Sequence, residues 1–499
     1  MRHRPRTALV SCAAALVAVL PALPAEGATP GAGSGPSPGA PGAGDAYYPD
    51  YGNGGYDVGH YGLRLKYRPD NDRLEGTATL SVTATQALSR FNLDFALDVA
   101  EVRVDGRPAR FARSGAHELE VSPARPLARG QRATIVVRYA GTPSEVRVDG
   151  RTNWQRTADG GIAANAPESA WWWFPSNDHP GDKATFDVDV TVPDGTQAIS
   201  NGTLESRSSR GGWTRYAWRS DKPQATYLAT LAMGGYDIAQ DTTSSGLPVL
   251  TAYGTGLGAD EGAARASVER TAEVTEWLER RFGPYPFNAV GGYVPNVDAA
   301  YALETQTRPV YAKGAFARGA NVSVVVHELA HQWYGDSVTV RKWKDVWLSE
   351  GFARYAEWLW SEEQGEGTAR ELADYAYSLY PADDPFWSVR PGDPGPENQF
   401  HPAVYARGAM ALQALRDAIG DRAFFAVLKG WPARHAYGNA SVEDFTAYAE
   451  KISGRELGSL FDTWLYRQGK PPSARAGAAP ERPASWKEIQ ATDRLHRGR

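Results

Sequence analysis

The spacing of apolar residues divides the chain into two parts. Between about residues 47 and 236, apolar and polar side chains alternate in short runs, which is typical of half-buried β-strands. The dipeptides Asp105-Gly106 and Asp194-Gly195 indicate turns between such runs. This pattern predicts a β-sandwich or saddle, with strands at about residues 77–83, 102–104, 134–139, 185–192 and 214–218.

After about residue 245 the spacing becomes helical. Apolar residues recur every three or four positions before Gly283-Pro284, so we predict a helix that has Ser267 as its N-cap and ends at this pair. Further helices are predicted at residues 349–360 and around residues 412–419. The expected fold class is therefore α+β and multidomain, with an N-terminal β domain at 47–240 and a mainly helical domain at 241–470.

The two ends of the chain differ in composition from a packed domain. Residues 1–28 combine early arginines, an apolar run and small residues, which is typical of a secretory signal peptide. A lipoprotein cleavage box that ends at Cys12 is the alternative, and it would anchor the chain to a membrane. Residues 29–46 are rich in Gly, Pro, Ala and Ser and predict a tether, whereas residues 471–499 predict a loose polar tail.

Length and charge narrow the range of functions. The chain has 499 residues, of which 42% are hydrophobic, so it can form sizeable cores. Its net charge of −5 provides no basic field, so we expect no nucleic acid partner. No segment after the signal approaches the roughly 18 apolar residues of a membrane span. We expect the mature protein to be an exported monomer. Because Cys12 is the only cysteine, no cysteine remains for a disulfide once the predicted signal peptide is cleaved off.

The strongest chemical signal is the pentapeptide His327-Glu328-Leu329-Ala330-His331. On a helix, two histidines four positions apart lie about 40° apart on one face and can bind one metal ion. The neighbouring valines would suit a buried helix or a strand, and periodicity does not decide between them. The alternative for the pentapeptide alone is a pair of core histidines that donate to backbone carbonyls.

A third ligand favours the metal site. Glu350 follows His331 after 18 residues and opens the helix predicted at 349–360, which can pack against the first helix. Two imidazoles and one carboxylate leave one open position on a tetrahedral Zn²⁺, as in a catalytic site. Glu328, beside the ligands, can take a proton from a zinc-bound water and pass it to the leaving amine. Alternatively, Glu350 merely interacts with the helix dipole.

The sequence resembles the aminopeptidase N family of zinc metallopeptidases over about residues 161–469. The most specific motifs are HELAHQWYGD at 327–336, WKDVWLSEGFARY at 343–355 and VYARGA at 404–409. Shorter similarities are KATFD at 183–187 and FGPYP at 282–286. This resemblance implies one Zn²⁺ per chain, peptide substrates and a thermolysin-like catalytic domain.

The resemblance also implies roles for residues that the spacing alone does not select. Tyr405 takes the position of the tyrosine that donates a hydrogen bond to the oxyanion. Glu304 matches a glutamate that grips the free α-amino group of the substrate. Glu168 matches a second amine-binding carboxylate if Ala166-Pro167-Glu168 aligns with the family's Gln-x-Glu motif, and the alternative is an ordinary loop carboxylate.

Some positions depart from the family pattern. Tyr301, Leu303 and Thr305 replace the Gly, Met and Asn around Glu304, and Ala166 replaces a Gln. The large C-terminal helical domain of many members has no counterpart in the sequence, which leads us to expect a more open cleft that admits longer peptides. The resemblance implies an aminopeptidase; the alternatives are a thermolysin-like endopeptidase and a secreted binding protein without catalysis.

Overall fold

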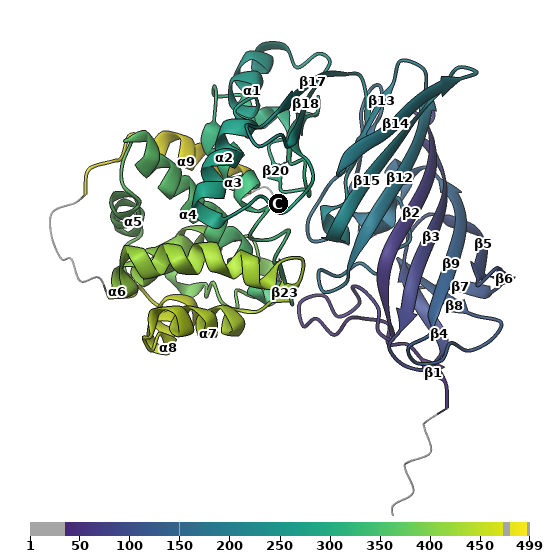
Figure 1. Ribbon diagram of the computed structural model, residues 1–499, viewed down its shortest axis with the longest axis horizontal. Helices are drawn as coiled ribbons and strands as arrows, with labels where there is room; N and C mark the ends of the chain where they lie inside the picture. Colours follow the sequence, from purple (N-terminus) through teal and green to yellow (C-terminus); the bar gives the residue numbers. More distant parts are fainter. Residues whose placement is uncertain (1–34, 149, 473–479, 497–499) are drawn as a thin grey trace, which may run out of the picture. The chain divides into compact units, whose positions relative to one another are not determined.

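The computed structural model describes residues 35–148, 150–472 and 480–496, and Pro36–Arg499 form one compact unit. The predicted signal peptide, including Cys12, lies outside the described residues. A sheet-rich N-terminal part is followed by a mainly helical part, which confirms the predicted α+β fold class (Figure 1).

The largest sheet of the described chain has eight strands and contains all five predicted strand regions. Its neighbouring strands are mostly antiparallel, but β2 and β12 pair in parallel. Alternate side chains of β2 and β12 are buried, which matches the alternation of apolar and polar residues in the sequence. In order across the sheet, the strands are β14 (Thr203–Arg210), β15 (Trp213–Ala225), β12 (Lys183–Pro193), β2 (Tyr56–Arg68), β3 (Arg73–Ala84), β9 (Arg132–Gly141), β5 (Asp98–Val104) and β6 (Arg107–Pro108).

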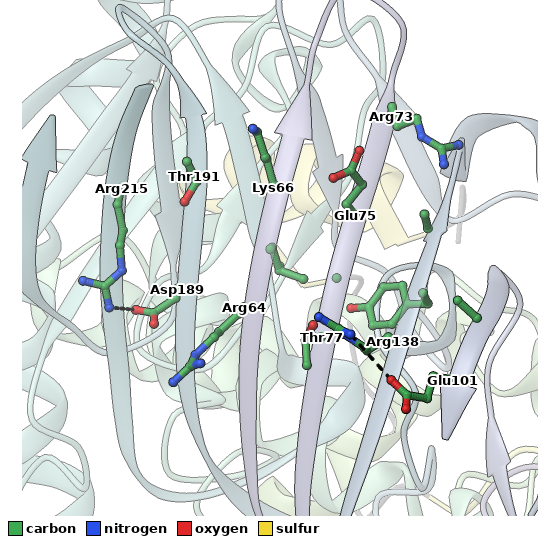
Figure 2. A pocket seen from close by; sticks show the side chains of 15 residues that line it. Arg64, Lys66, Arg73, Glu75, Thr77, Glu101, Arg138, Asp189, Thr191 and Arg215 are labelled. Atoms are coloured by element: carbon green, nitrogen blue, oxygen red, sulfur yellow. Dashed lines mark hydrogen bonds and ion pairs between the residues drawn. The ribbon is translucent and has the colours of Figure 1, made fainter. Parts of the chain in front are cut away.

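Charged side chains cover one face of this sheet, where they line a broad depression (Figure 2). Arg215 pairs with Asp189 at 2.6 Å, and Arg138 lies 3.6 Å from Glu101. Because these side chains are partly exposed, each pair contributes little stability. This face supplies the polar half of the alternating pattern.

Two smaller sheets complete the N-terminal part. One consists of β1 (Ser37–Pro38), β4 (Leu88–Asp94), β8 (Glu118–Ser122) and β7 (Arg110–Ser114). The other consists of β10 (Trp154–Arg156), β11 (Gly161–Ala163), β16 (Leu231–Gly234) and β13 (Gln197–Ser200). Trp171, Trp172 and Trp173, which follow β11, are all buried in the core.

A five-stranded sheet begins the second part, and it shifts the expected boundary. Its first strand, β17, spans Tyr236–Thr242 and pairs with β18. The five-stranded sheet therefore begins before residue 240, and the predicted boundary falls inside β17. The strands are β17 (Tyr236–Thr242), β18 (Pro248–Gly254), β19 (Val290–Val294), β21 (Val310–Tyr311) and β20 (Ala302–Leu303), and a separate pair is β22 (Thr339–Val340) with β23 (Asn439–Ala440).

Helices form most of the second part. In Figure 1, α3, α4 and α6 lie close together, and α3 and α6 each contact α4. Gly420, at a φ of 76°, interrupts α6. The helices are α1 (Glu261–Val268), α2 (Thr271–Phe282), α3 (Val322–Ala330), α4 (Trp347–Gln364), α5 (Ala369–Ser378), α6 (Pro402–His435), α7 (Val442–Ser453), α8 (Gly458–Phe461) and α9 (Trp486–His496).

The helix predicted before Gly283 ends there but begins later than expected. Gly283 has a φ of 97°, a conformation that favours glycine. Ser267 is not the N-cap of this helix, because it lies inside α1, where its hydroxyl donates to the carbonyl of Ala263. A separate short helix therefore precedes α2.

Residues 36–55, which we call the N-terminal segment, pack against both parts of the chain. β1 pairs with β4, the Asp45 carboxylate accepts from the Trp343 amide at 2.9 Å, and the Tyr48 hydroxyl donates to Gln399 at 2.7 Å. The tether predicted at residues 29–46 is therefore wrong for residues 36–46. Specific hydrogen bonds to a folded surface order a composition that could not form a core alone.

The C-terminal prediction also needs correction. α9 lies within the tail predicted as loose, and its Trp486 and Ile489 are buried. The Asn321 amide nitrogen lies 3.2 Å from the Thr492 hydroxyl, which joins α9 to the start of α3. Among residues 35–148, 150–472 and 480–496, no helix has both the length and the apolar character needed to span a bilayer.

Lys183 joins the two parts. It begins β12, and its ammonium group donates to the backbone carbonyls of Asp336 and Ser337 at 2.8 and 3.0 Å. From the other side, the Asn439 side chain donates to the Pro180 carbonyl at 2.7 Å. Since these bonds are made across the junction, the β-rich part helps to position the loop that follows α3.

Candidate metal centre

Helix α3 positions the two predicted histidines. Its N-cap is Asn321, whose side chain accepts from the Val324 amide, so the run of valines is helical and not a strand. His327 lies in the helix and His331 follows its last residue in a helical conformation. Both rings are fully buried, with centroids 4.8 Å apart. The expected arrangement of two imidazoles on one helical face is therefore present.

Helix α4 supplies the predicted carboxylate. Glu350 lies in its first turn, and one oxygen, Oε2, lies 3.2 Å from His327 Nε2 and 3.3 Å from His331 Nε2. The three groups offer donor atoms that all lie within 4.8 Å of one another. Two imidazole nitrogens and a carboxylate oxygen are the donor types that zinc accepts, so the residues fit this metal.

Outer partners orient both rings. His327 Nδ1 lies 2.7 Å from a carboxylate oxygen of Glu357, and His331 Nδ1 lies 3.1 Å from the Tyr334 carbonyl and 2.9 Å from the Ser349 hydroxyl. Hydrogen bonds at Nδ1 leave the Nε2 lone pairs facing Glu350, as in proteins whose metal-binding histidines are held by an outer carboxylate or carbonyl.

Glu357 was not among the residues predicted from the sequence. Its signal was present, because Glu357 lies seven positions after Glu350, or about two turns of helix, on the same face. A search for carboxylates on the helical face that contains the third ligand would have found it. Its Oε2 also lies 3.2 Å from the Arg354 guanidinium, which is buried beside it.

The electrostatics of the site favour a cation. Burial disfavours the charged form of His331, but Glu350 and Glu304 outweigh it and raise the pKa of His331 to about 10. For His327, burial is likewise outweighed by hydrogen bonds to Glu350 and Glu357, and its pKa is raised. A buried set of carboxylates therefore needs positive charge, and a divalent cation can take the place of the protons.

Glu328 and Glu304 lie next to this set. Their carboxylates and His331 offer donor atoms within 4.8 Å of one another, and both side chains are buried. Glu304 follows β20, and its backbone carbonyl accepts from the Gln332 side chain at 3.2 Å. Gln332, another residue missed by the sequence analysis, also accepts from the Thr307 amide at 2.7 Å. It thus ties the Glu304 loop to the end of α3.

Tyr405 approaches from a third helix. It lies in the first turn of α6, whose N-cap is His401, and it is almost fully buried. Its ring centroid is 6.0 Å from that of His327, with 27° between the planes. Tyr405 therefore lies beside His327, although it is more than fifty residues away in sequence from His327, His331 and Glu350.

Glu168 lies outside the cluster formed by His327, His331 and Glu350. Its carboxylate accepts from the Asn153 side chain at 3.2 Å and lines a cavity of about 850 Å³ together with Tyr48, Gln399 and Phe400. Burial raises the pKa of Glu168 to about 7 despite this hydrogen bond. A smaller adjoining cavity of about 140 Å³ shares Asn153 and reaches Leu303, the residue before Glu304.

Known protein families match both parts of the chain. The Peptidase M1 N-terminal domain matches residues 58–228, and the Peptidase family M1 domain matches residues 309–464. Aminopeptidase M1 of Arabidopsis thaliana is 28% identical over 328 residues, which are 61% of this chain and 36% of the plant protein. Aminopeptidase M1-D of Oryza sativa is 27% identical over 449 residues, which are 82% of this chain and 50% of that protein. The chain thus spans a third to a half of the length of these curated relatives.

A solved structure matches more completely. The crystal structure of a mutant M1 zinc metallopeptidase from Deinococcus radiodurans is 31% identical, with a TM-score of 0.77, and the match covers 88% of this chain and 100% of the other. A complex of that enzyme's mutant with a Tyr-Ser-Ala substrate matches at 32% identity and a TM-score of 0.76. Since both domains match in order and a solved relative aligns along its whole length, this chain belongs to the M1 family of zinc metallopeptidases.

Proposed function

We propose that this chain is an exported zinc aminopeptidase that removes N-terminal residues from peptides. The observation that carries this proposal is the position of Glu304. Its carboxylate lies within 4.8 Å of donor atoms of His331 and Glu328. It is nevertheless not a member of the metal-binding cluster, in which the Glu350 carboxylate lies beside Nε2 of both histidines. A further buried carboxylate beside a hydrolytic centre suits a substrate ammonium group.

Each residue near the centre has a proposed task. Zinc, when bound by His327, His331 and Glu350, polarises the scissile carbonyl and acidifies water. Glu328 takes a proton from the attacking water and delivers it to the leaving amine nitrogen. The Tyr405 hydroxyl donates a hydrogen bond to the oxyanion as the carbonyl carbon becomes tetrahedral.

Glu304 provides the proposed preference for free N-termini. An α-ammonium group pairs with a carboxylate, whereas an acetylated terminus offers no charge and leaves the buried carboxylate without compensation. Glu168 is proposed as a second partner of the amine. The adjoining cavities that run from Glu168 past Asn153 to Leu303 support this assignment.

The test compares one peptide with a free N-terminus and the same peptide after N-acetylation. We expect hydrolysis of the free peptide and almost none of the acetylated one. Removing the metal with a chelator should abolish hydrolysis of the free peptide, and adding Zn²⁺ should restore it. Glu304→Gln keeps the shape but removes the charge, so kcat/KM on the free peptide should fall about 10–100-fold, which is the value of one charged hydrogen bond.

Other outcomes identify the alternatives. Equal cleavage of both peptides would instead support a thermolysin-like endopeptidase. Unchanged hydrolysis by Glu328→Ala would place the activity at another site, and absence of hydrolysis in every arm would favour a binding protein.

Export is proposed from the composition of residues 1–28. The test is N-terminal sequencing of protein recovered from the culture medium and from cell fractions. A mature chain that begins near residue 29 in the medium is expected. Membrane-bound protein beginning at Cys12 would support lipid anchoring instead. Sedimentation of the purified chain tests the proposed monomer.

A further inference from the structure

A second cluster of metal-binding side chains lies in the β-rich part. Asp94 ends β4, and Glu118, which begins β8, is its cross-strand partner. His117 precedes Glu118, and the three residues offer donor atoms that all lie within 4.8 Å of one another. All three are more than nine-tenths buried. These strands contain none of the residues of the metal centre described above.

Several donor atoms of this cluster are buried without a hydrogen-bond partner. Among the described residues, none makes a hydrogen bond of normal geometry to Asp94 Oδ1, to either carboxylate oxygen of Glu118 or to His117 Nδ1. Asp94 Oδ1 lies 3.7 Å from His117 Nε2, which is too long for a hydrogen bond. Since buried polar atoms are rarely left unsatisfied, these atoms need an additional ligand or a proton.

The remaining contacts of the cluster fix its geometry. Asp94 Oδ2 accepts from the Asn53 side chain at 3.1 Å and from the Asp178 amide at 2.7 Å. His117 Nε2 lies 3.1 Å from the Asp50 carbonyl, to which it can only donate. With Nε2 as the donor, Nδ1 is the ring nitrogen whose lone pair can bind a metal ion, and it is buried without a hydrogen-bond partner among the described residues.

The surrounding charges leave both carboxylates uncompensated. Burial raises the pKa of Asp94 well above the usual range, and the neighbouring carboxylates of Glu118, Asp178 and Asp50 add to this effect. Burial also raises the pKa of Glu118 to about 8, and the nearby Asn92 side chain, which does not reach normal hydrogen-bond geometry, offsets only part of this effect. Either protons or a cation must therefore neutralise the pair.

We propose that Asp94, His117 and Glu118 bind a second divalent cation, of the class of Zn²⁺ or Mn²⁺, which has a structural role. One imidazole nitrogen with carboxylate oxygens is a donor set for such borderline metals, whereas Ca²⁺ requires six to eight oxygen ligands. The proposal does not depend on the proposed peptidase function, because no residue is shared with that site.

Such a cation would join three segments. Asp50 and Asn53 belong to the N-terminal segment, and the His117 ring stacks on Trp171 with centroids 4.2 Å apart. Trp171 follows Glu168 by three residues. The cation would therefore hold both the N-terminal segment and the loop of Glu168 against β4 and β8.

The experiment measures the metal content of the full chain, purified from medium that contains zinc and manganese. We expect about two cations per chain in the natural protein and about one in Glu118→Gln, which should keep its hydrolytic activity and melt at a lower temperature. Glu350→Gln, altered only at the first centre, should also retain about one cation while losing activity.

The opposite result has a clear signature. Glutamine is isosteric with a protonated glutamate, so a cluster that only shares a proton would tolerate Glu118→Gln. About one cation in both the natural chain and Glu118→Gln, with an equal or higher melting temperature for the variant, would overturn the proposal. If Glu118→Gln fails to fold, the metal content of Glu350→Gln decides the question. About one cation per chain in Glu350→Gln supports the second site, and no bound cation refutes it.

Discussion

Replacing Glu357 with glutamine tests whether the outer partner of His327 controls metal binding. The carboxylate accepts from His327 Nδ1 at 2.7 Å and is fully buried in α4. Glu357→Gln preserves the length and an acceptor oxygen but removes the negative charge. The imidazole therefore keeps its orientation and becomes a weaker electron donor to the cation.

The magnitude follows from the type of hydrogen bond. A bond to a charged group contributes about 1.5–3 kcal/mol and a neutral one about 0.5–1.5 kcal/mol. The difference of about 1–1.5 kcal/mol corresponds to roughly a tenfold weaker affinity for Zn²⁺. Glu357→Ala also removes the acceptor beside the buried Arg354, so its loss should approach 100-fold, at the upper end of effects for outer residues.

The assay is a titration of activity against a metal buffer that fixes free Zn²⁺. Glu363→Gln is the matched control, because Glu363 lies on the same helix and pairs at the surface with Arg281. We expect the midpoint to shift about tenfold for Glu357→Gln and to stay in place for Glu363→Gln. A midpoint equal to that of the natural chain in both variants would refute the outer-partner argument.

Three further predictions concern the cleft and the junction. Tyr405→Phe should lower kcat about 10²–10³-fold with zinc content unchanged, as for loss of one oxyanion donor; a kcat within twofold, compared by steady-state kinetics, would exclude that role. Because burial raises the pKa of Glu168 to about 7 and only its ionised form pairs with ammonium, kcat/KM should fall as pH drops below about 7. The profile of Glu168→Gln should lack this decline, and identical profiles would argue against the role. Lys183→Met should cost on the order of 3 kcal/mol by leaving buried carbonyls without a donor, as measured by denaturant unfolding; an unchanged midpoint would contradict this.

Local patterns in the sequence predicted the centre of the site well. His327, His331 and Glu350 have a spacing that helical geometry converts directly into proximity, and the structure places them together. Strands with strict alternation, such as β3 and β12, were predicted for the same reason. Tyr405 and Glu304 came only from family resemblance, because no local rule relates residues so far apart in sequence.

The missed features depend on tertiary contacts. A Gly- and Pro-rich composition disfavours a core, but it does not exclude ordering by specific hydrogen bonds such as those of Asp45 and Tyr48. Ser267 has the residue type of an N-cap, yet its hydroxyl donates back along its own helix, as serine can do inside helices. The sequence did not predict the cluster of Asp94, His117 and Glu118, because the pairing of β4 with β8 brings Asp94 next to Glu118.

The N-terminal segment also has a practical consequence for making the protein. The match to the known N-terminal domain begins at residue 58, so a shortened gene designed from that match would start near β2. Such a product would lose Asp45 and Tyr48, and with them bonds to Trp343 and Gln399 on the helical side. Truncation libraries should therefore keep residue 36 onward, and affinity tags belong before that position.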